Sequence, residues 1–336
     1  MSVSLQFLQR CAAETGYRPG ALEKVIRLGE LAGDMGRHPF LGTVLALKGG
    51  TALNLCFGTP NRLSADLDFN YTGDASREKM QADRPRVEEA LEQLAQRRGY
   101  RIQRSADAFA GRKLYLTYGS VLGHQDRIET DLNFLFRTPI GVTGLRALWQ
   151  PGGLDRPVLP VVSLDELCIG KVLALLDRAA ARDVWDVVRL PGIAGDSLSS
   201  RLFRSRLIAL SAILNHPLET YERRMLEERI NDRSIAEQLV PMLSGDESPG
   251  ATDLVERAWA VLAPLLKLTP EEREYTVAIQ RGELRTDLLF PDDPEAGKRL
   301  GEHPAIQWKL LNVRGHLARL QGQRKQSLLS DEKTEA

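Results

Sequence analysis

The chain has 336 residues, of which 43% are hydrophobic, enough to form the cores of two domains. Lys and Arg together number 45, as do Asp and Glu, so no overall charge attracts the protein to nucleic acid or to a membrane. Any contact with RNA must therefore be local.

The three cysteines, Cys11, Cys56 and Cys168, are widely spaced and show no Cys-x-x-Cys pattern, which argues against a disulfide framework or a zinc site. Residues 1–17 lack a basic segment followed by a long apolar run, and no stretch approaches the length of a membrane span. We therefore expect a cytoplasmic protein without a membrane partner.

The first expected elements are a helix over residues 21–33 and a buried strand over residues 42–47. The strand leads into Lys48-Gly49-Gly50-Thr51, and apolar residues with helical spacing follow directly. A helix that begins here offers free N–H groups to phosphate oxygens, and the glycines let the backbone come close to them. A Gly-Gly turn alone is more often a plain turn.

Residues 66–71 (DLDFNY) alternate as in a strand, which places Asp66, Asp68 and Asn70 on one face. Two carboxylates on one face repel each other unless a divalent cation such as Mg²⁺ binds between them. An Asp-x-Asp pair alone is often only a solvated strand edge. The order of glycine turn and acidic strand favours a site for a nucleotide and its metal.

A charged helix over residues 84–98 and strands over residues 113–118 and 127–136 follow. Alternation in the last strand puts Glu129, Asp131 and Asn133 on one face. Either acid is available as a third carboxylate, and either is compatible with a simple edge-strand charge.

Residues 157–162 are expected to be an extended linker, and Ser163-x-x-Glu166 has the capping-box form that begins a helix ending near Arg178. Lys171 and Arg178 share one face of this helix, two turns apart, as a clamp for a triphosphate would require. The alternative is that the Lys171 ammonium extends to solvent.

In the next helix, which is expected to end at Pro191, Asp183 and Asp186 share one face. Either a salt bridge with Arg178 or Arg182 or a catalytic role suits them.

From residue 198 onward the periodicity is helical, and Thr269 followed by Pro270 indicates a helix start. The strongest local charge imbalance is the basic C-terminal stripe, which has one acid, Glu302, and the basic residues Lys298, Arg299, Lys309, Arg314, Arg319, Arg324 and Lys325. Trp308 and His316 would add stacking to phosphate contacts with RNA. A solvated helix face is the alternative.

The motifs Lys48-Gly-Gly-Thr-Ala-Leu53 and Arg62-x-Ser-x-Asp-Leu-Asp-Phe69 resemble the signature of DNA polymerase β-like nucleotidyltransferases, and most closely that of the AbiEii/AbiGii toxin family, which includes the MenT toxins. A second stretch, Lys171-x-x-Ala-Leu-x-x-Arg178 with Arg182-Asp-x-x-Asp186, also resembles this family. The resemblance is strongest over residues 47–190 and weak over residues 198–264.

The resemblance implies an α/β (α+β) nucleotidyltransferase domain with a mixed sheet over residues 1–190. It also implies an α-helical domain over residues 191–336 that carries the basic C-terminal stripe and a polar tail, with the site between the two.

The resemblance implies a catalytic set of Asp66, Asp68, Asp131 and Lys171, with Asp66, Asp68 and Asp131 binding Mg²⁺. The implied nucleotide-binding residues are Lys48, Gly49, Gly50, Thr51, Ser64, Arg178, Asp183 and Asp186.

The implied activity is the transfer of a nucleotidyl group from an NTP to an acceptor. RNA is the expected acceptor, with tRNA 3′ ends as the target of some relatives, and a separately encoded antitoxin is the expected partner. Two rivals remain open: a small-molecule, antibiotic-modifying nucleotidyltransferase, and a non-catalytic module that only binds NTP.

Overall fold

The computed structural model of the chain describes residues 3–245 and 248–334, except for the side chains of residues 322 and 324–334. Arg324 and Lys325 of the basic C-terminal stripe therefore lie outside the described side chains.

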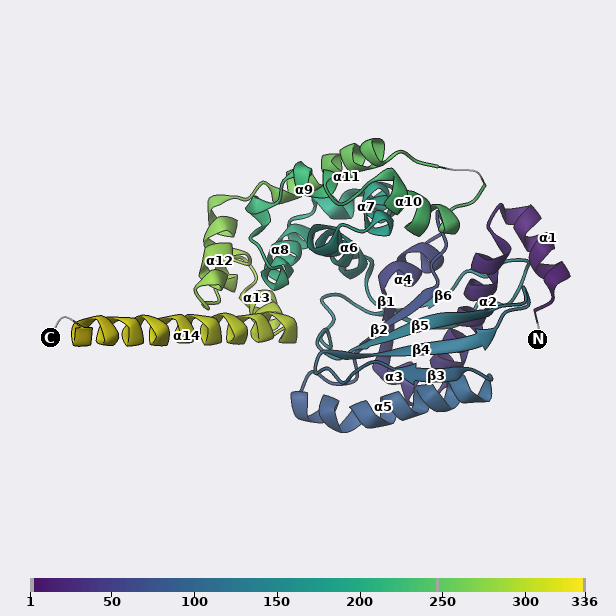
Figure 1. Cartoon of the computed structure of the whole chain (residues 1–336), viewed down its shortest axis with the longest axis horizontal. Coiled ribbons are helices and arrows are strands. Elements are labelled where there is room, and N and C mark those ends of the chain that lie inside the picture. Colours follow the sequence, from purple (N-terminus) through teal and green to yellow (C-terminus); the bar gives the residue numbers. More distant parts are fainter. Residues whose placement is uncertain (1–2, 246–247, 335–336) are drawn as a thin grey trace. The chain divides into compact units, whose positions relative to one another are not determined.

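The chain forms two compact units (Figure 1). The first comprises Met1–Leu198 and Glu222–Leu262, and the second comprises Ser199–Tyr221 and Ala263–Ala336. The expected domains, residues 1–190 and 191–336, stay a prediction, but residues 222–262 pack with the N-terminal part of the chain. Helical periodicity shows that a segment has an apolar face without showing which core that face joins.

The first unit is built on a mixed seven-stranded sheet with the strand order β3-β4-β5-β2-β1-β7-β6. Strand β2 runs antiparallel to β1 and parallel to β5, and β1 runs parallel to β7. The strands are β1 (Leu45–Lys48), β2 (Asp66–Tyr71), β3 (Arg101–Arg104), β4 (Gly111–Gly119), β5 (Gln125–Asn133), β6 (Gly144–Ala147) and β7 (Val158–Val161). The expected α/β class with a mixed sheet is confirmed.

The α-helices in chain order are α1 (Leu5–Thr15), α2 (Pro19–Arg37), α3 (Leu41–Val44), α4 (Gly49–Cys56), α5 (Arg77–Arg97), α6 (Leu164–Arg178), α7 (Ala181–Ala194), α8 (Arg201–Leu210), α9 (Arg223–Glu227), α10 (Asp232–Gln238), α11 (Ala251–Leu266), α12 (Pro270–Gln280), α13 (Pro294–Gly301) and α14 (Pro304–Thr334). The 3₁₀ helices are η1 (Gly195–Ser199), η2 (Ser211–Ile213), η3 (Leu218–Thr220), η4 (Val240–Met242) and η5 (Thr286–Leu288). Among the described residues, no helix is both long and apolar enough to cross a bilayer.

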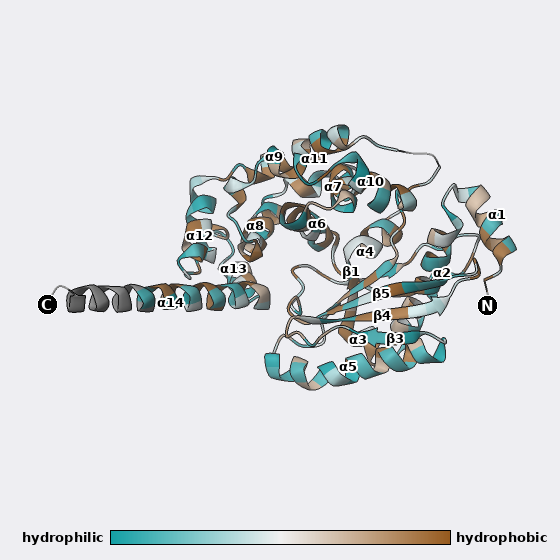
Figure 2. Ribbon diagram, viewed as in Figure 1, coloured by the Kyte–Doolittle hydropathy of each residue, from teal (hydrophilic) through white to brown (hydrophobic). Residues whose placement is uncertain are grey.

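The two faces of β2 have different surroundings, as its alternating sequence predicts. Leu67, Phe69 and Tyr71 are buried, and the Tyr71 hydroxyl donates to Asp83 of α5 at 2.7 Å. Figure 1 shows α5 along this side of the sheet and α4 on the opposite side. The carboxylates of β2 therefore face α4. Figure 2 shows that α6 is largely hydrophobic whereas α5 is mostly hydrophilic, in agreement with the many buried residues of α6.

Three sequence expectations about elements are wrong in part. Residues 42–44 belong to α3 rather than to a strand, because the His38 ring nitrogen accepts the backbone N–H groups of Phe40 and Leu41 and so starts a helical turn. The expected linker at residues 157–162 contains β7, which pairs with β1 and β6. Helix α7 continues past Pro191 to Ala194, because a proline in the last turn removes only one hydrogen bond there.

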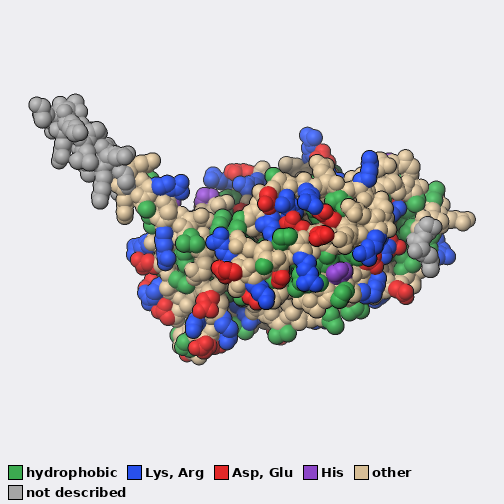
Figure 3. All heavy atoms as spheres, turned by 90° about the horizontal axis from the view of Figure 1, so that it is seen from below, with side chains coloured by type: hydrophobic (Ala, Val, Ile, Leu, Met, Phe, Trp, Pro, Cys, Tyr) green, Lys and Arg blue, Asp and Glu red, His purple; other side chains and the backbone are tan. Residues whose placement is uncertain are grey.

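The second unit confirms the helix start expected at Thr269. Its side chain accepts from the N–H of Glu272 at 3.3 Å, and the Glu272 carboxylate accepts from the N–H of Thr269 at 2.8 Å. In α12, Tyr275 is fully buried and its hydroxyl donates to the backbone oxygen of Ala209 at 3.2 Å, which joins α12 to α8. On the face shown in Figure 3, basic and acidic side chains are interspersed, as the equal numbers of charges lead one to expect.

Candidate active site

Four charged residues form a row across one face of the sheet. Lys48 of β1 is in register with Asp68 of β2, which is in register with Asp131 of β5, which is in register with Lys113 of β4. Residues in register on neighbouring strands project to the same face. Two carboxylates therefore lie at the centre of the row, with a lysine on each side.

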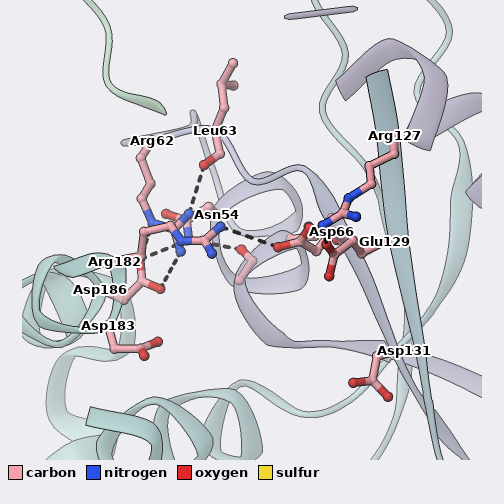
Figure 4. Close-up of polar contacts among 12 residues, drawn as sticks. Asn54, Arg62, Leu63, Asp66, Arg127, Glu129, Asp131, Arg182, Asp183 and Asp186 are labelled. Carbon is pink, nitrogen blue, oxygen red and sulfur yellow. Dashed lines mark hydrogen bonds and ion pairs between the residues drawn. The ribbon is translucent and has the colours of Figure 1, made fainter. Parts of the chain in front are cut away.

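The next row pairs Asp66 with Glu129. Glu129 is already engaged, because Arg127 lies 2.7 Å and Lys113 lies 3.6 Å from its carboxylate oxygens. Within the described part of the chain, Lys113, at 3.9 Å, is the only ion-pair partner of Asp131. Figure 4 shows Arg127 directed at Glu129, with Asp131 apart from both. The weaker engagement of Asp131 favours it over Glu129 as the third carboxylate.

Asp68 has a raised pKa in this position. Burial raises its pKa, and the nearby charges of Asp66 and Asp131 raise it further, against the lowering effect of Lys48 and Lys171. Negative charge at this point is therefore destabilised, and a bound divalent cation would remove the destabilisation.

The donor set fits Mg²⁺, which prefers oxygen ligands and is commonly held by one or two carboxylates together with substrate phosphates. Asp66 and Asp68 supply two carboxylates from one strand face. Among the described residues no three His, Cys, Asp or Glu side chains already form a metal cluster. A contribution from Asp131 therefore requires its side chain to turn toward Asp68.

The glycine turn lies directly against these acids. Gly49, the first residue of α4, has φ +72°, and a Cβ there would lie 2.3 Å from the Oδ2 atom of Asp68. A Cβ on Gly50 would lie 2.9 Å from the Arg62 guanidinium and 3.0 Å from the Ser64 hydroxyl. Both positions therefore need glycine. Thr51 is fully buried, and its hydroxyl donates to the backbone oxygen of Asp66, which ties α4 to β2.

Gly49→Ala is expected to reduce transfer and to lower the free energy of unfolding by about 1 kcal/mol or more, because the new Cβ is strained at positive φ and displaces Asp68. Thermal unfolding and nucleotide incorporation measure the two effects. The control is Gly58→Ala, since Gly58 also has positive φ (+101°) but nothing lies within 4 Å of its Cβ position. Equal activity of the two variants would contradict the close approach of Gly49 to Asp68.

Lys171 and Arg178 of α6 meet the same partner, Asp183 of α7. The Lys171 ammonium lies 3.2 Å from Asp183 and 2.7 Å from Asp186, and Arg178 donates to both oxygens of Asp183 at 2.6 and 3.0 Å. Burial would raise the pKa of Asp183, but the hydrogen bond from Arg178 and the charge of Lys171 outweigh it and lower that pKa. Lys171 is 7% exposed, so the alternative of an ammonium extended into solvent is wrong.

Asp186 is the centre of a buried network that the sequence did not reveal. Arg62, which is 1% exposed, donates to its two oxygens at 2.8 and 2.7 Å, and Asn54 of α4 donates to it at 3.1 Å. Figure 4 shows Arg62 and Asn54 converging on Asp186. Burial raises the pKa of this carboxyl, but Arg62 and Lys171 outweigh that effect and hold the pKa well below its usual range.

These elements enclose a cavity of about 210 Å³, lined by Gly50, Arg62, Ser64, Asp66, Asp68, Lys113, Glu129, Asp131, Lys171, Arg178, Arg182 and Asp183. Lys48, Gly49, Thr51 and Asp186 were expected to bind nucleotide but do not line the cavity. All lining residues belong to the first unit, and the expectation of a site between two domains stays a prediction.

The sequence interpretation missed Arg62, Lys113 and Arg182 as site residues. Arg182 lies 3.4 Å from Asp66, and Figure 4 marks this ion pair with a dashed line. Lys113 was recognisable only through its register opposite Asp131, which requires the strand pairing. Arg62 could have been recognised from the sequence, because it is a charged residue within the motif itself, four positions before Asp66.

Comparisons with known proteins identify a family for the chain. The family model "Nucleotidyl transferase AbiEii toxin, Type IV TA system" matches residues 34–262. Among solved structures, the chain is similar to MenT4, a nucleotidyltransferase toxin from Mycobacterium tuberculosis H37Rv, with a TM-score of 0.61 and 20% identity over 89% of this chain and 99% of that chain. No curated protein matches significantly. The family model covers more than half of the chain, and the chain therefore belongs to the AbiEii family of nucleotidyltransferase toxins.

Proposed function

We propose that this protein transfers a nucleotidyl group from an NTP to the 3′ end of an RNA, with tRNA as the acceptor class, in a reaction that depends on Mg²⁺. The observation that carries the proposal is the row of Lys48, Asp68, Asp131 and Lys113, of which Asp68, Asp131 and Lys113 line the cavity together with Gly50. The cavity thus combines carboxylates for a metal with cations for phosphates.

Asp66, Asp68 and Asp131 would hold Mg²⁺, which when bound activates the acceptor hydroxyl and stabilises the leaving pyrophosphate. The free N–H groups at the start of α4, beside Gly50, which has no side chain, would bind phosphate oxygens. Ser64, which lines the same wall, would add a hydroxyl donor. In the overall step the acceptor oxygen bonds to the α-phosphorus, the bond to pyrophosphate breaks, and the hydroxyl proton is released.

Lys171 would neutralise the triphosphate. An ammonium has three N–H donors, and Asp183 and Asp186 receive two of them. The third would donate to a phosphate oxygen at Gly50, whose Cβ position lies 3.6 Å from the Lys171 nitrogen. Asp183 and Asp186 would therefore act by holding Lys171 and Arg178 rather than by touching the nucleotide themselves.

Lys171→Ala is expected to lower kcat/KM for NTP by roughly 10²-fold or more, because a cation aimed at phosphate charge in a partly enclosed site is lost. Steady-state kinetics with labelled NTP measure the effect. Lys24→Ala is the control, because Lys24 also forms an ion pair (with Asp126, 2.8 Å) but does not line the cavity. NTP use like that of the parent protein would leave Lys171 with a purely structural role.

The function itself is tested by incubating the protein with each labelled NTP, Mg²⁺ and total RNA, followed by gel separation. Labelled tRNA that disappears when EDTA is added supports the proposal. A labelled small molecule without labelled RNA would move the assignment to the antibiotic-modifying alternative. NTP binding without any transfer would identify a non-catalytic module. In cells, we propose a separately encoded antitoxin as the partner that limits this activity.

A further inference from the structure

The second unit contains a cavity that the proposed chemistry does not use. It has a volume of about 420 Å³ and is lined by residues 211–217, by four residues of α12 (Tyr275, Thr276, Ile279 and Gln280), and by residues of α14 between Trp308 and Leu317. Figure 1 shows α12 beside α14. Sites for small organic ligands have volumes of roughly 300–1,000 Å³. The cavity therefore has room for a nucleobase with its ribose.

Helix α14 presents an aromatic and polar stripe to this cavity. Trp308, Asn312 and His316 recur every four residues, so they share one face of the helix, and all three line the cavity. The Trp308 side chain is 45% exposed. A large aromatic ring left open beside a cavity is the usual platform on which proteins stack an unpaired base.

The rim also offers hydrogen-bonding groups that have no partner within the described part of the chain. The side-chain amides of Asn215, Gln280 and Asn312 line the cavity and make no hydrogen bond there. Each amide carries both donors and an acceptor, the groups that read the edge of an unpaired base.

The charge of the cavity suits a polyanion. Among the described residues no Asp or Glu lines it, whereas Lys309 does, and the Lys309 ammonium donates to the backbone oxygen of Leu214 at 2.7 Å. Further along α14, Arg314 donates to the backbone oxygen of Gly282 at 2.7 Å, and Arg319 is exposed. Phosphates on either side of a stacked base would meet these cations. An apolar peptide would leave the amides unsatisfied, so the surroundings favour nucleic acid over a peptide.

We propose that this cavity of the second unit binds an unpaired nucleobase of the RNA acceptor, stacked on Trp308, as a second RNA-binding site. The inference rests on the proposed RNA acceptor. It makes the second unit an RNA-binding element that combines stacking in the cavity with phosphate binding along α14.

The test compares binding of a single-stranded 12-nucleotide RNA with binding of the same ribose-phosphate chain without bases. Trp308→Ala should weaken binding of the intact RNA by roughly 5- to 150-fold and leave binding of the abasic chain unchanged. Trp308→Phe should restore most of the affinity. The matched control is Leu311→Ala, because Leu311 is 66% exposed on the same helix but does not line the cavity.

Salt dependence separates stacking from charge. Trp308→Ala should leave the slope of log affinity against log salt unchanged, whereas replacing Arg314 and Arg319 by Gln should lower the slope by about one unit for each phosphate that the protein no longer binds. Equal affinity of the parent protein and Trp308→Ala for intact RNA overturns the inference. An equal decrease in affinity for the intact RNA and for the abasic chain also overturns it. So does a cavity that binds an apolar peptide which RNA does not displace. If every variant still transfers label to RNA, the proposed function holds even where the inference about this cavity fails.

Discussion

Asp68→Ala is expected to abolish nucleotidyl transfer while the protein remains folded. Asp68 is the central acid of the charged row, in register with both Lys48 and Asp131, and Asp66 alone cannot hold a metal and its phosphates in place. The rate should fall by on the order of 10³-fold or more, which corresponds to about 4 kcal/mol of transition-state stabilisation. Label incorporation at saturating Mg²⁺ measures it.

Stability should not fall with activity in this variant. Burial and the charges of Asp66 and Asp131 raise the pKa of Asp68, so its ionised form is disfavoured where it stands, and removing it relieves repulsion. The free energy of unfolding without metal should therefore equal or exceed that of the parent protein. A folded Asp68→Ala protein with unchanged incorporation would refute the metal-binding role.

The third carboxylate can be identified in the same assay. Asp131→Ala should lose most of the activity, because Asp131 is the register partner of Asp68. Glu129→Ala should lose less, because Glu129 is held by Arg127 and Lys113 and faces Asp66 from the next row. The reverse order of the two losses would assign the role to Glu129.

Local sequence patterns predicted those features of the site that depend on a single strand or helix. Alternation along residues 66–71 and 127–136 correctly placed the acids on one strand face, and the Ser163 side chain caps α6 as expected. These features depend on the period of a strand or on the first turn of a helix, and both can be read from a few neighbouring residues.

Features that depend on distant pairing were not predictable in this way. Arg62 and Asp186 are 124 positions apart, and no local pattern indicates that they meet. Residues 158–161 resembled a linker because a four-residue strand with a proline is too short for a clear alternation, and only pairing with β1 and β6 makes it part of the sheet. The assignment of residues 222–262 to the first unit likewise depends on which core their apolar faces join.

Arg62→Met is expected to produce the largest loss of stability, about 3–5 kcal/mol, because it removes a two-point partner from Asp186 and leaves that carboxylate buried with a charge only partly compensated. Lys171 remains as a partner but then lies between two carboxylates with one fewer cation near them. Urea unfolding, monitored by tryptophan fluorescence, measures the loss in the free energy of unfolding. The signal reports on the first unit, which contains Trp149, Trp185 and Trp259.

The double variant Arg62→Met/Asp186→Leu separates an unpaired charge from lost packing. Replacing both members of a buried ion pair by apolar residues of similar volume is often neutral, so the double variant should regain most of the stability lost by Arg62→Met. It should still use NTP poorly, because Asp186 no longer holds the Lys171 ammonium beside Gly50. The exposed pair Arg201 and Asp292 provides the control, since Arg201→Met should change stability by less than about 1 kcal/mol. A double variant as unstable as Arg62→Met would show that the guanidinium acts by packing, whereas recovered stability together with full NTP use would show that Lys171 needs only Asp183 to hold its position.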